Sequence, residues 1–173
     1  MRPLFTLLVI PAALLIGCGD SGPQDFDQDG FPFTFEYPED LEVSTDVSFD
    51  SDLGAAADDT VAVGIDDSNG IVVQRFTLQV AIDEGNLDRA QAEFDRLISD
   101  VDPDASSETG ETAGLPSLTY GAIQVPNPPD GESRITMFFD GDQEYLINCQ
   151  STPDEREAIN AACDQALETL AAT

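Results

Sequence analysis

Four carboxylates near the start of the chain have the spacing of a calcium-binding loop. Residues 25–30 read Asp-Phe-Asp-Gln-Asp-Gly, and Glu36 follows six residues after the glycine. In such a loop alternate carboxylates converge on Ca²⁺, and the distal glutamate completes the oxygen shell. No helix is predicted before residue 25, however, and Pro32 lacks a backbone donor. The candidate calcium ligands are Asp25, Asp27, Asp29 and Glu36, and an acidic spacer without metal is the interpretation we favour.

Other chemistry has few residues to carry it. The chain has no His and no Lys, and its 35 acidic residues against six Arg give a formal charge of −29. The missing His excludes imidazole bases and His-metal sites, and the charge excludes generic binding of nucleic acid. Two carboxyls with raised pKa in one cleft could cleave a glycoside, but no pair stands out among so many acids. Gly114-Leu115-Pro116-Ser117 lacks the spacing of a nucleophile elbow. We expect no catalytic residues and no cofactor.

The first residues predict export. Arg2 precedes an apolar run from Leu4 to Ile16, which is too short to span a bilayer and is typical of a secretory signal peptide. The run ends in Leu-Ile-Gly-Cys, which resembles the lipobox of bacterial lipoproteins, in which the cysteine receives the lipid and becomes the mature N-terminus. We therefore expect lipidation at Cys18 and an extracytoplasmic, membrane-anchored protein. The alternatives are an ordinary cleaved signal and an uncleaved anchor.

The two remaining cysteines are expected to pair with each other. Cys149 follows Tyr145 and Ile147 on one face of a predicted strand, and Cys163 lies on the apolar stripe of the last predicted helix. If that helix folds back on the strand, the sulfurs meet, and an oxidising compartment favours the disulfide. Two buried free thiols are the alternative. A metal site is not expected, because no His and no third thiol are nearby.

Hydrophobic periodicity predicts strands interrupted and closed by helices. Alternating apolar residues predict strands over residues 33–37, 41–49, 61–65, 71–80, 118–125, 135–139 and 145–149. Asn69-Gly70 and Asp140-Gly141 predict hairpin turns. Spacings of three and four predict a helix capped by Asn86 that ends near Val101, and another capped by Thr152, with Glu155 completing a capping box. Residues 50–59 are expected to form a loop and residues 106–112 a linker.

These elements predict an α+β fold, with an antiparallel sheet and helices packed on its faces. The aromatic-rich run at residues 33–38, the order of the elements and the strand ending at residues 148–150 resemble the PsbP-like superfamily, and within it the LpqN-type bacterial lipoproteins. The resemblance implies an α-β-α sandwich that serves as a non-catalytic binding or assembly module. The expected organisation is a signal peptide over residues 1–17, an acidic flexible tether over 18–30 and a single domain over 31–173.

We therefore expect a lipid-anchored protein of the cell envelope that binds or assembles with an unidentified envelope protein or small ligand. A calcium-binding envelope protein is the alternative, and a carboxylate-based hydrolase is the second alternative. The proline-rich loop at residues 126–131 and the Phe-Pro-Phe run at residues 31–33 are possible recognition elements, although stiffening and burial explain them better. Arg75 and Arg134 are expected on strands, where ion pairing with nearby acids is favoured over binding of an acidic ligand.

Overall fold

The structure, a computed structural model, describes residues 22–45 and 57–173. These residues form two helices, α1 (Leu87–Ile98) and α2 (Arg156–Thr169). The strands are β1 (Gln24–Phe26), β2 (Phe33–Tyr37), β3 (Glu42–Ser44), β4 (Asp59–Asp66), β5 (Asn69–Ile82), β6 (Ser107–Thr112), β7 (Leu115–Val125), β8 (Gly131–Ser151) and β9 (Ala171–Ala172). The signal peptide, the lipidation site Cys18 and most of the expected loop at residues 50–59 lie outside the described residues.

The main sheet has the order β3-β4-β5-β8-β7-β6, and a smaller sheet has the order β1-β2-β9. Every strand pair between these elements is antiparallel. β8 doubles back on itself, because its first half pairs with β7 and its second half pairs with β5. Gly141 supports that turn with a φ of +63°, a conformation that glycine adopts without strain. The expected hairpin at Asp140-Gly141 and the α+β fold class are confirmed.

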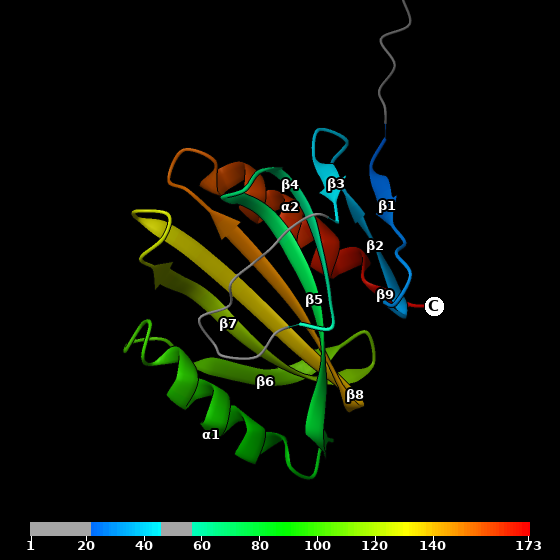
Figure 1. Ribbon diagram of the computed structural model, residues 1–173, viewed down its shortest axis with the longest axis vertical. Coiled ribbons are helices and arrows are strands. Elements are labelled where there is room, and N and C mark those ends of the chain that lie inside the picture. Colours follow the sequence, from blue (N-terminus) through cyan, green and yellow to red (C-terminus); the bar gives the residue numbers. More distant parts are fainter. Residues whose placement is uncertain (1–21, 46–56) are drawn as a thin grey trace, which may run out of the picture.

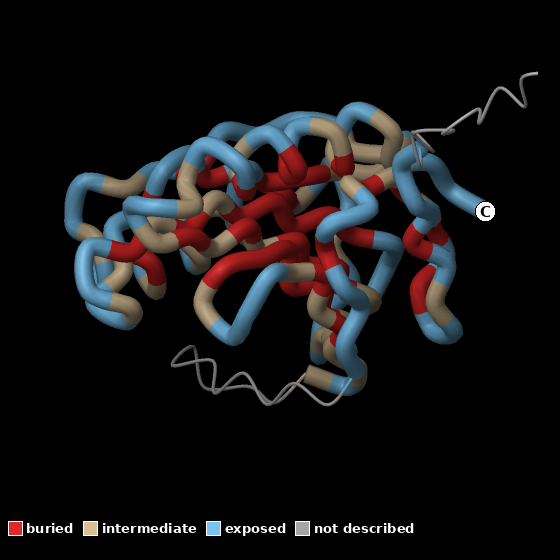
Figure 2. The backbone as a smooth tube through the Cα atoms, turned by 90° about the horizontal axis from the view of Figure 1, so that it is seen from above, coloured by how far each residue is buried: buried red, intermediate tan, exposed pale blue. Residues whose placement is uncertain are grey.

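The two helices cover opposite faces of the main sheet and lie towards opposite ends of it (Figure 1). Alternation along β8 makes the two faces visible: Tyr145 and Ile147 join the core under α2, whereas Leu146 between them joins the core under α1. The small sheet packs beside α2 and contributes the aromatic residues of that core. Buried backbone accordingly runs through the middle of the molecule, with exposed segments around it (Figure 2).

The folded domain begins earlier than expected. β1 pairs with β2, and the ring of Phe26 stacks on that of Phe35 with centroids 4.4 Å apart. Phe26 is fully buried, because it extends the row of aromatic side chains that β2 presents to the core. The tether expected over residues 18–30 therefore ends by Gln24. A single aromatic residue among acids gave too weak a periodic signal for a three-residue strand.

Two connections also differ from the expectation. Residues 107–112, expected as a linker, form the edge strand β6, which pairs along its whole length with β7. Its Ser, Thr and Glu side chains show no apolar alternation because most of them are exposed. Between β4 and β5 the turn is at Asp67 and Ser68, since Asn69 and Gly70 already pair with β4. The hairpin is confirmed, and its turn lies before the Asn-Gly pair.

The helices begin differently from the predicted caps. Asn86 precedes α1, but its side chain accepts a hydrogen bond from the backbone N–H of Asp83 at 3.0 Å and donates to the carbonyl of Ala81. α2 begins at Arg156, and the hydroxyl of Thr152 donates to the side chain of Asn69 at 3.0 Å. Asn86 therefore stabilises the loop before α1, Thr152 joins the start of α2 to the start of β5, and the predicted capping box of α2 does not form.

Candidate functional site

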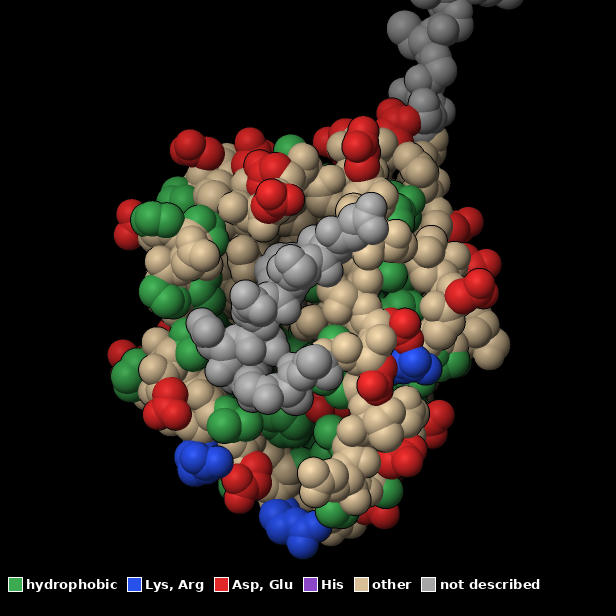
Figure 3. Space-filling view, in the orientation of Figure 1, with side chains coloured by type: hydrophobic (Ala, Val, Ile, Leu, Met, Phe, Trp, Pro, Cys, Tyr) green, Lys and Arg blue, Asp and Glu red, His purple; other side chains and the backbone are tan. Residues whose placement is uncertain are grey.

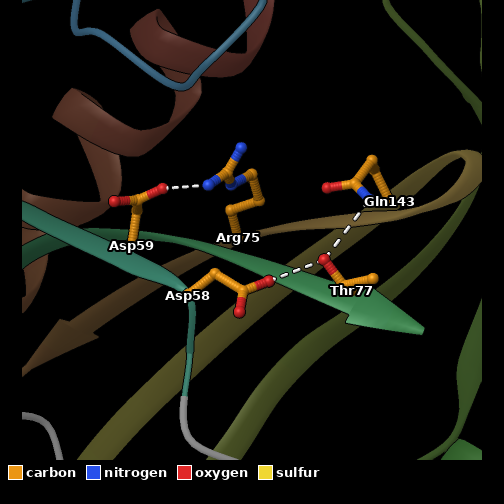
Figure 4. A network of polar contacts seen from close by, with 5 residues as sticks. All are labelled: Asp58, Asp59, Arg75, Thr77 and Gln143. Atoms are coloured by element: carbon orange, nitrogen blue, oxygen red, sulfur yellow. Dashed lines mark hydrogen bonds and ion pairs between the residues drawn. The ribbon is translucent and has the colours of Figure 1, made fainter. Parts of the chain in front are cut away.

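Arg75 lies on β5, where it forms an ion pair with Asp59, its cross-strand neighbour on β4. Beside this pair, the hydroxyl of Thr77 donates to the carboxylate of Asp58 at 2.8 Å, and the amide of Gln143 donates to the same hydroxyl at 3.4 Å (Figure 4). Arg75 and Thr77 of β5 thus each bind one of the two neighbouring acids, Asp59 and Asp58. This ion pair agrees with the expectation that Arg75 pairs with a nearby acid.

The arginines near α2 have a similar role. Arg134 on β8 donates to Asp164 on α2 at 2.8 Å. Arg156 at the start of α2 donates to the carbonyl of Asp130 at 2.9 Å, and its Nε lies 3.4 Å from the carboxylate of Glu132. These contacts join α2 to the end of the proline-rich loop. The loop therefore contributes to packing, as do Phe31 and Phe33 in the other suggested recognition element, both of which are buried.

Asp95 fixes α1 against the sheet. One of its carboxylate oxygens accepts hydrogen bonds from the hydroxyl of Tyr120 at 2.7 Å, the hydroxyl of Ser107 at 2.8 Å and the backbone N–H of Ser107 at 3.1 Å. Burial alone would raise the pKa of Asp95, but these three donors outweigh it and lower the pKa. Burial and the carboxylate of Asp95 raise the pKa of Tyr120. The sequence did not single out this cluster, because its members lie on three different elements.

Glu144 is the most unusual ionisable group of the described residues. It lies on β8 on the same face as Leu146 and opposite Phe76 of β5, and only 5% of it is exposed. No described residue donates a hydrogen bond or offers a cation to its carboxyl. Burial raises its pKa to about 7, so it is partly protonated at neutral pH. Period-two alternation with Leu146 is the sequence signal for this burial.

A cavity of about 300 Å³ opens at the end of the main sheet where β4 turns into β5. Its lining includes Gly64 and Gly70, which pair across the two strands. A methyl group on Gly70 would lie 2.7 Å from the Cα of Gly64, so the close approach requires glycine here. The volume is at the lower end of the range for small-molecule sites, which starts at about 300 Å³.

The described wall of this cavity is acidic and contains no Lys or Arg. Its charged residues are Glu42, Asp66 and Asp67. Asp66 is already engaged, because it accepts hydrogen bonds from the backbone N–H of Ser68 at 2.8 Å and from the amide of Asn69 at 3.0 Å. Those bonds lower the pKa of Asp66 and keep it charged. The cavity therefore suits a neutral or cationic group and would repel an anion.

The calcium-loop residues are not arranged as an EF-hand. Asp25 and Glu36, the first and last residues of the pattern, face each other across the β1–β2 pair, and Asp27 and Asp29 lie in the connecting turn. Among residues 22–45 and 57–173, no cluster of three or more carboxylate, thiolate or imidazole side chains is placed to hold a metal ion. The described residues therefore show no calcium site, and calcium binding stays a hypothesis that a binding measurement tests.

The pair of carboxyls that the hydrolase alternative requires is also missing from the part of the chain that the structure describes. Burial raises the pKa of Glu144, but Glu144 does not line the described cavity and so is not one of two acids in a cleft. Ser117, in the Gly-Leu-Pro-Ser run, is buried on β7 and has no base beside it among these residues. These observations give the hydrolase alternative no support.

The expected disulfide is present. Cys149 of β8 and Cys163 of α2 are bonded, with their Cα atoms 6.0 Å apart, and both are buried beneath α2. The third cysteine of the chain, Cys18, lies outside the described residues. Within residues 22–45 and 57–173, neither helix combines the length and hydropathy needed to cross a bilayer.

The antiparallel sheet, with α1 and α2 on opposite faces, defines a PsbP-like α+β fold, as the sequence resemblance implied. The chain matches no protein-family model and no curated protein sequence.

A solved structure shows the same architecture. The solution structure of cyanobacterial PsbP (CyanoP) from Synechocystis sp. PCC 6803 is similar to this chain with a TM-score of 0.56 and 13% identity, over 92% of this chain and 99% of that one. A crystal structure from Bacteroides thetaiotaomicron VPI-5482 has a TM-score of 0.48 and 12% identity, over 86% of this chain and 48% of that one, which is too remote to carry an argument. At these identities the likeness concerns the fold alone.

Proposed function

We propose that this chain is a lipid-anchored, extracytoplasmic protein of the cell envelope that acts as a non-catalytic binding or assembly module. The lipid is attached to Cys18 after removal of residues 1–17. The partner is an envelope protein or a small ligand. A module of this kind needs a stable, soluble domain and an anchor, and it does not need a preorganised set of catalytic groups.

The observation that carries the proposal is the distribution of the three cysteines. Two of them, Cys149 and Cys163, are joined in the core, a bond that persists in oxidising compartments and is rare in the cytosol. Cys18 then stands alone, directly after a short apolar run and six residues before the first residue of β1. That position suits a thiol that accepts a lipid. It does not suit one that packs in the core.

The charge and the fold support the rest of the proposal. The excess of carboxylates keeps the domain soluble and repels anionic lipid headgroups, so a covalent lipid is needed to hold it at a membrane. The PsbP-like fold hosts unrelated functions and so does not favour a particular partner. Among the described surfaces, the cavity beside the β4–β5 turn is one to which a neutral or cationic partner group could bind.

Partition of the native protein between detergent and water tests the anchor. The wild type should enter the detergent phase, whereas a Cys18→Ser variant should stay in the membrane as an unprocessed precursor or appear without lipid. Crosslinking in intact envelopes, followed by mass spectrometry, should then recover the same partner from the wild type in repeated experiments. Wild-type protein that stays in the aqueous phase contradicts the proposal.

A further inference from the structure

We propose that the lipid anchor holds the domain in one orientation, with α1 pointing away from the bilayer. The inference rests on the proposed function, because it requires a lipid on Cys18. The part of the domain that then faces the bilayer includes two loops, residues 38–42 and residues 66–69, which we name the proximal end. The lipid surface is thus the neighbour of the proximal end, and the region around α1 is the one presented to other components of the envelope.

The first argument is the length of the connection. Only residues 19–23 separate Cys18 from Gln24, the first residue of β1. Even fully extended, this connection covers no more than about 22 Å. A tether that continued to residue 30, as expected from the sequence, would cover about twice that distance and would leave the orientation free. The pairing of β1 with β2 removes this freedom.

The second argument is where β1 begins. Gln24 is the cross-strand neighbour of Tyr37, and its side-chain amide donates to the carbonyl of Glu39 at 3.2 Å. Residues 38–42 therefore lie beside the start of β1. Glu42 opens β3 and pairs with Gly64, close to the β4–β5 turn. Both loops thus lie at the end from which the chain continues to Cys18 (Figure 1).

The third argument compares the connection with the size of the domain. α1 lies at the opposite end of the main sheet from the start of β1 (Figure 1). A compact domain of this length is about 40 Å across. The connection of about 22 Å is much shorter than that. The domain can therefore tilt about its attachment, but it cannot turn over to bring α1 onto the bilayer.

Charge adds a condition on the distance to the membrane. Five carboxylates on the proximal end are exposed: Glu39, Asp40, Glu42, Asp66 and Asp67. None of the ion pairs among the described residues involves these five carboxylates. Acidic side chains gather at this end of the face shown in Figure 3, and the arginines visible there lie further towards the other end. Anionic headgroups repel such a surface only within a Debye length, about 8 Å at physiological salt. The connection is long enough for a gap of that size.

Energy transfer to labelled lipids tests the orientation. The full lipidated protein is reconstituted in phosphatidylcholine vesicles that carry an acceptor dye, with a donor on one new cysteine. The two sites are exposed: Asp67→Cys at the proximal end and Ala92→Cys on α1. The native disulfide leaves no other thiol for the dye once Cys18 is acylated. Thermal melting of each variant checks the fold.

We expect several-fold stronger transfer from position 67 than from position 92. The difference should shrink when a Gly-Ser segment of about thirty residues is inserted after residue 20, and phosphatidylglycerol at low salt should weaken transfer from position 67. Equal transfer from both sites, or stronger transfer from position 92, overturns the orientation. Wild-type protein that fails to float with the vesicles overturns the lipid anchor itself, so the two failures are distinguishable.

Discussion

Replacing Glu144 by Gln should stabilise the protein at neutral and alkaline pH. Its carboxyl is buried on β8 with no described partner, and burial raises its pKa from 4.5 to about 7. The folded state therefore holds a proton that the unfolded state releases, and stability falls as the pH rises from about 4.5 to about 7. A shift of about 2.5 pKa units corresponds to about 3 kcal/mol. Glutamine has nearly the same shape and does not titrate, so it removes this loss.

Urea unfolding between pH 5 and pH 8.5 measures the effect. This pH window covers the raised pKa of Glu144. The free energy of unfolding of the wild type should fall by about 2.5 kcal/mol across it, and that of Glu144→Gln should stay nearly constant. Glu39→Gln is the matched control, because Glu39 is exposed and should leave the wild-type slope in place. Parallel curves for the wild type and Glu144→Gln would refute the claim that the carboxyl of Glu144 is buried with no partner that stabilises its charge.

Three further predictions concern the contacts that hold the domain together. Replacing Cys149 and Cys163 together by Ala should cost about 3 kcal/mol, as measured by urea unfolding, and a reducing agent should lower the wild-type midpoint towards that of the variant. Asp95→Asn should cost about 2 kcal/mol at pH 7 and less as the pH falls below the ordinary value of 3.8, because the stability that its lowered pKa provides is lost as the pH falls through that pKa; a cost that does not change with pH would contradict this. Gly70→Ala should lower the melting temperature, because its new methyl group would meet the Cα of Gly64 at 2.7 Å, and an unchanged melting temperature would contradict the close strand approach.

The sequence predicted the parts of the fold that bury regular apolar patterns. The alternation in β2 and in both halves of β8, and the three-four spacing of α2, gave the fold class and placed Cys149 opposite Cys163. It missed β6 because an exposed edge strand needs no apolar residues, and it missed β1 because one buried aromatic side chain, Phe26, carries no period. The predicted caps do not form because the side chain of Asn86 hydrogen-bonds within its own loop and the hydroxyl of Thr152 donates to Asn69.

The candidate site was harder to predict than the fold. The calcium spacing came from the local sequence, but pairing of β1 with β2 places Asp25 opposite Glu36 instead of in a common loop. The cavity at the β4–β5 turn is lined by residues of β3, β4, β5 and β8, and the Asp95 cluster joins three elements. Such arrangements depend on register and on packing between distant segments, and no local motif records them. The arginines are an exception, because an excess of acids made their ion pairing predictable.

The mass of the N-terminal peptide of the native protein tests the central claim most directly. We expect a peptide that begins at Cys18 and carries a thioether-linked diacylglyceryl group, with residues 1–17 absent. A native polypeptide that begins at Met1, or that carries an unmodified Cys18, would contradict the account.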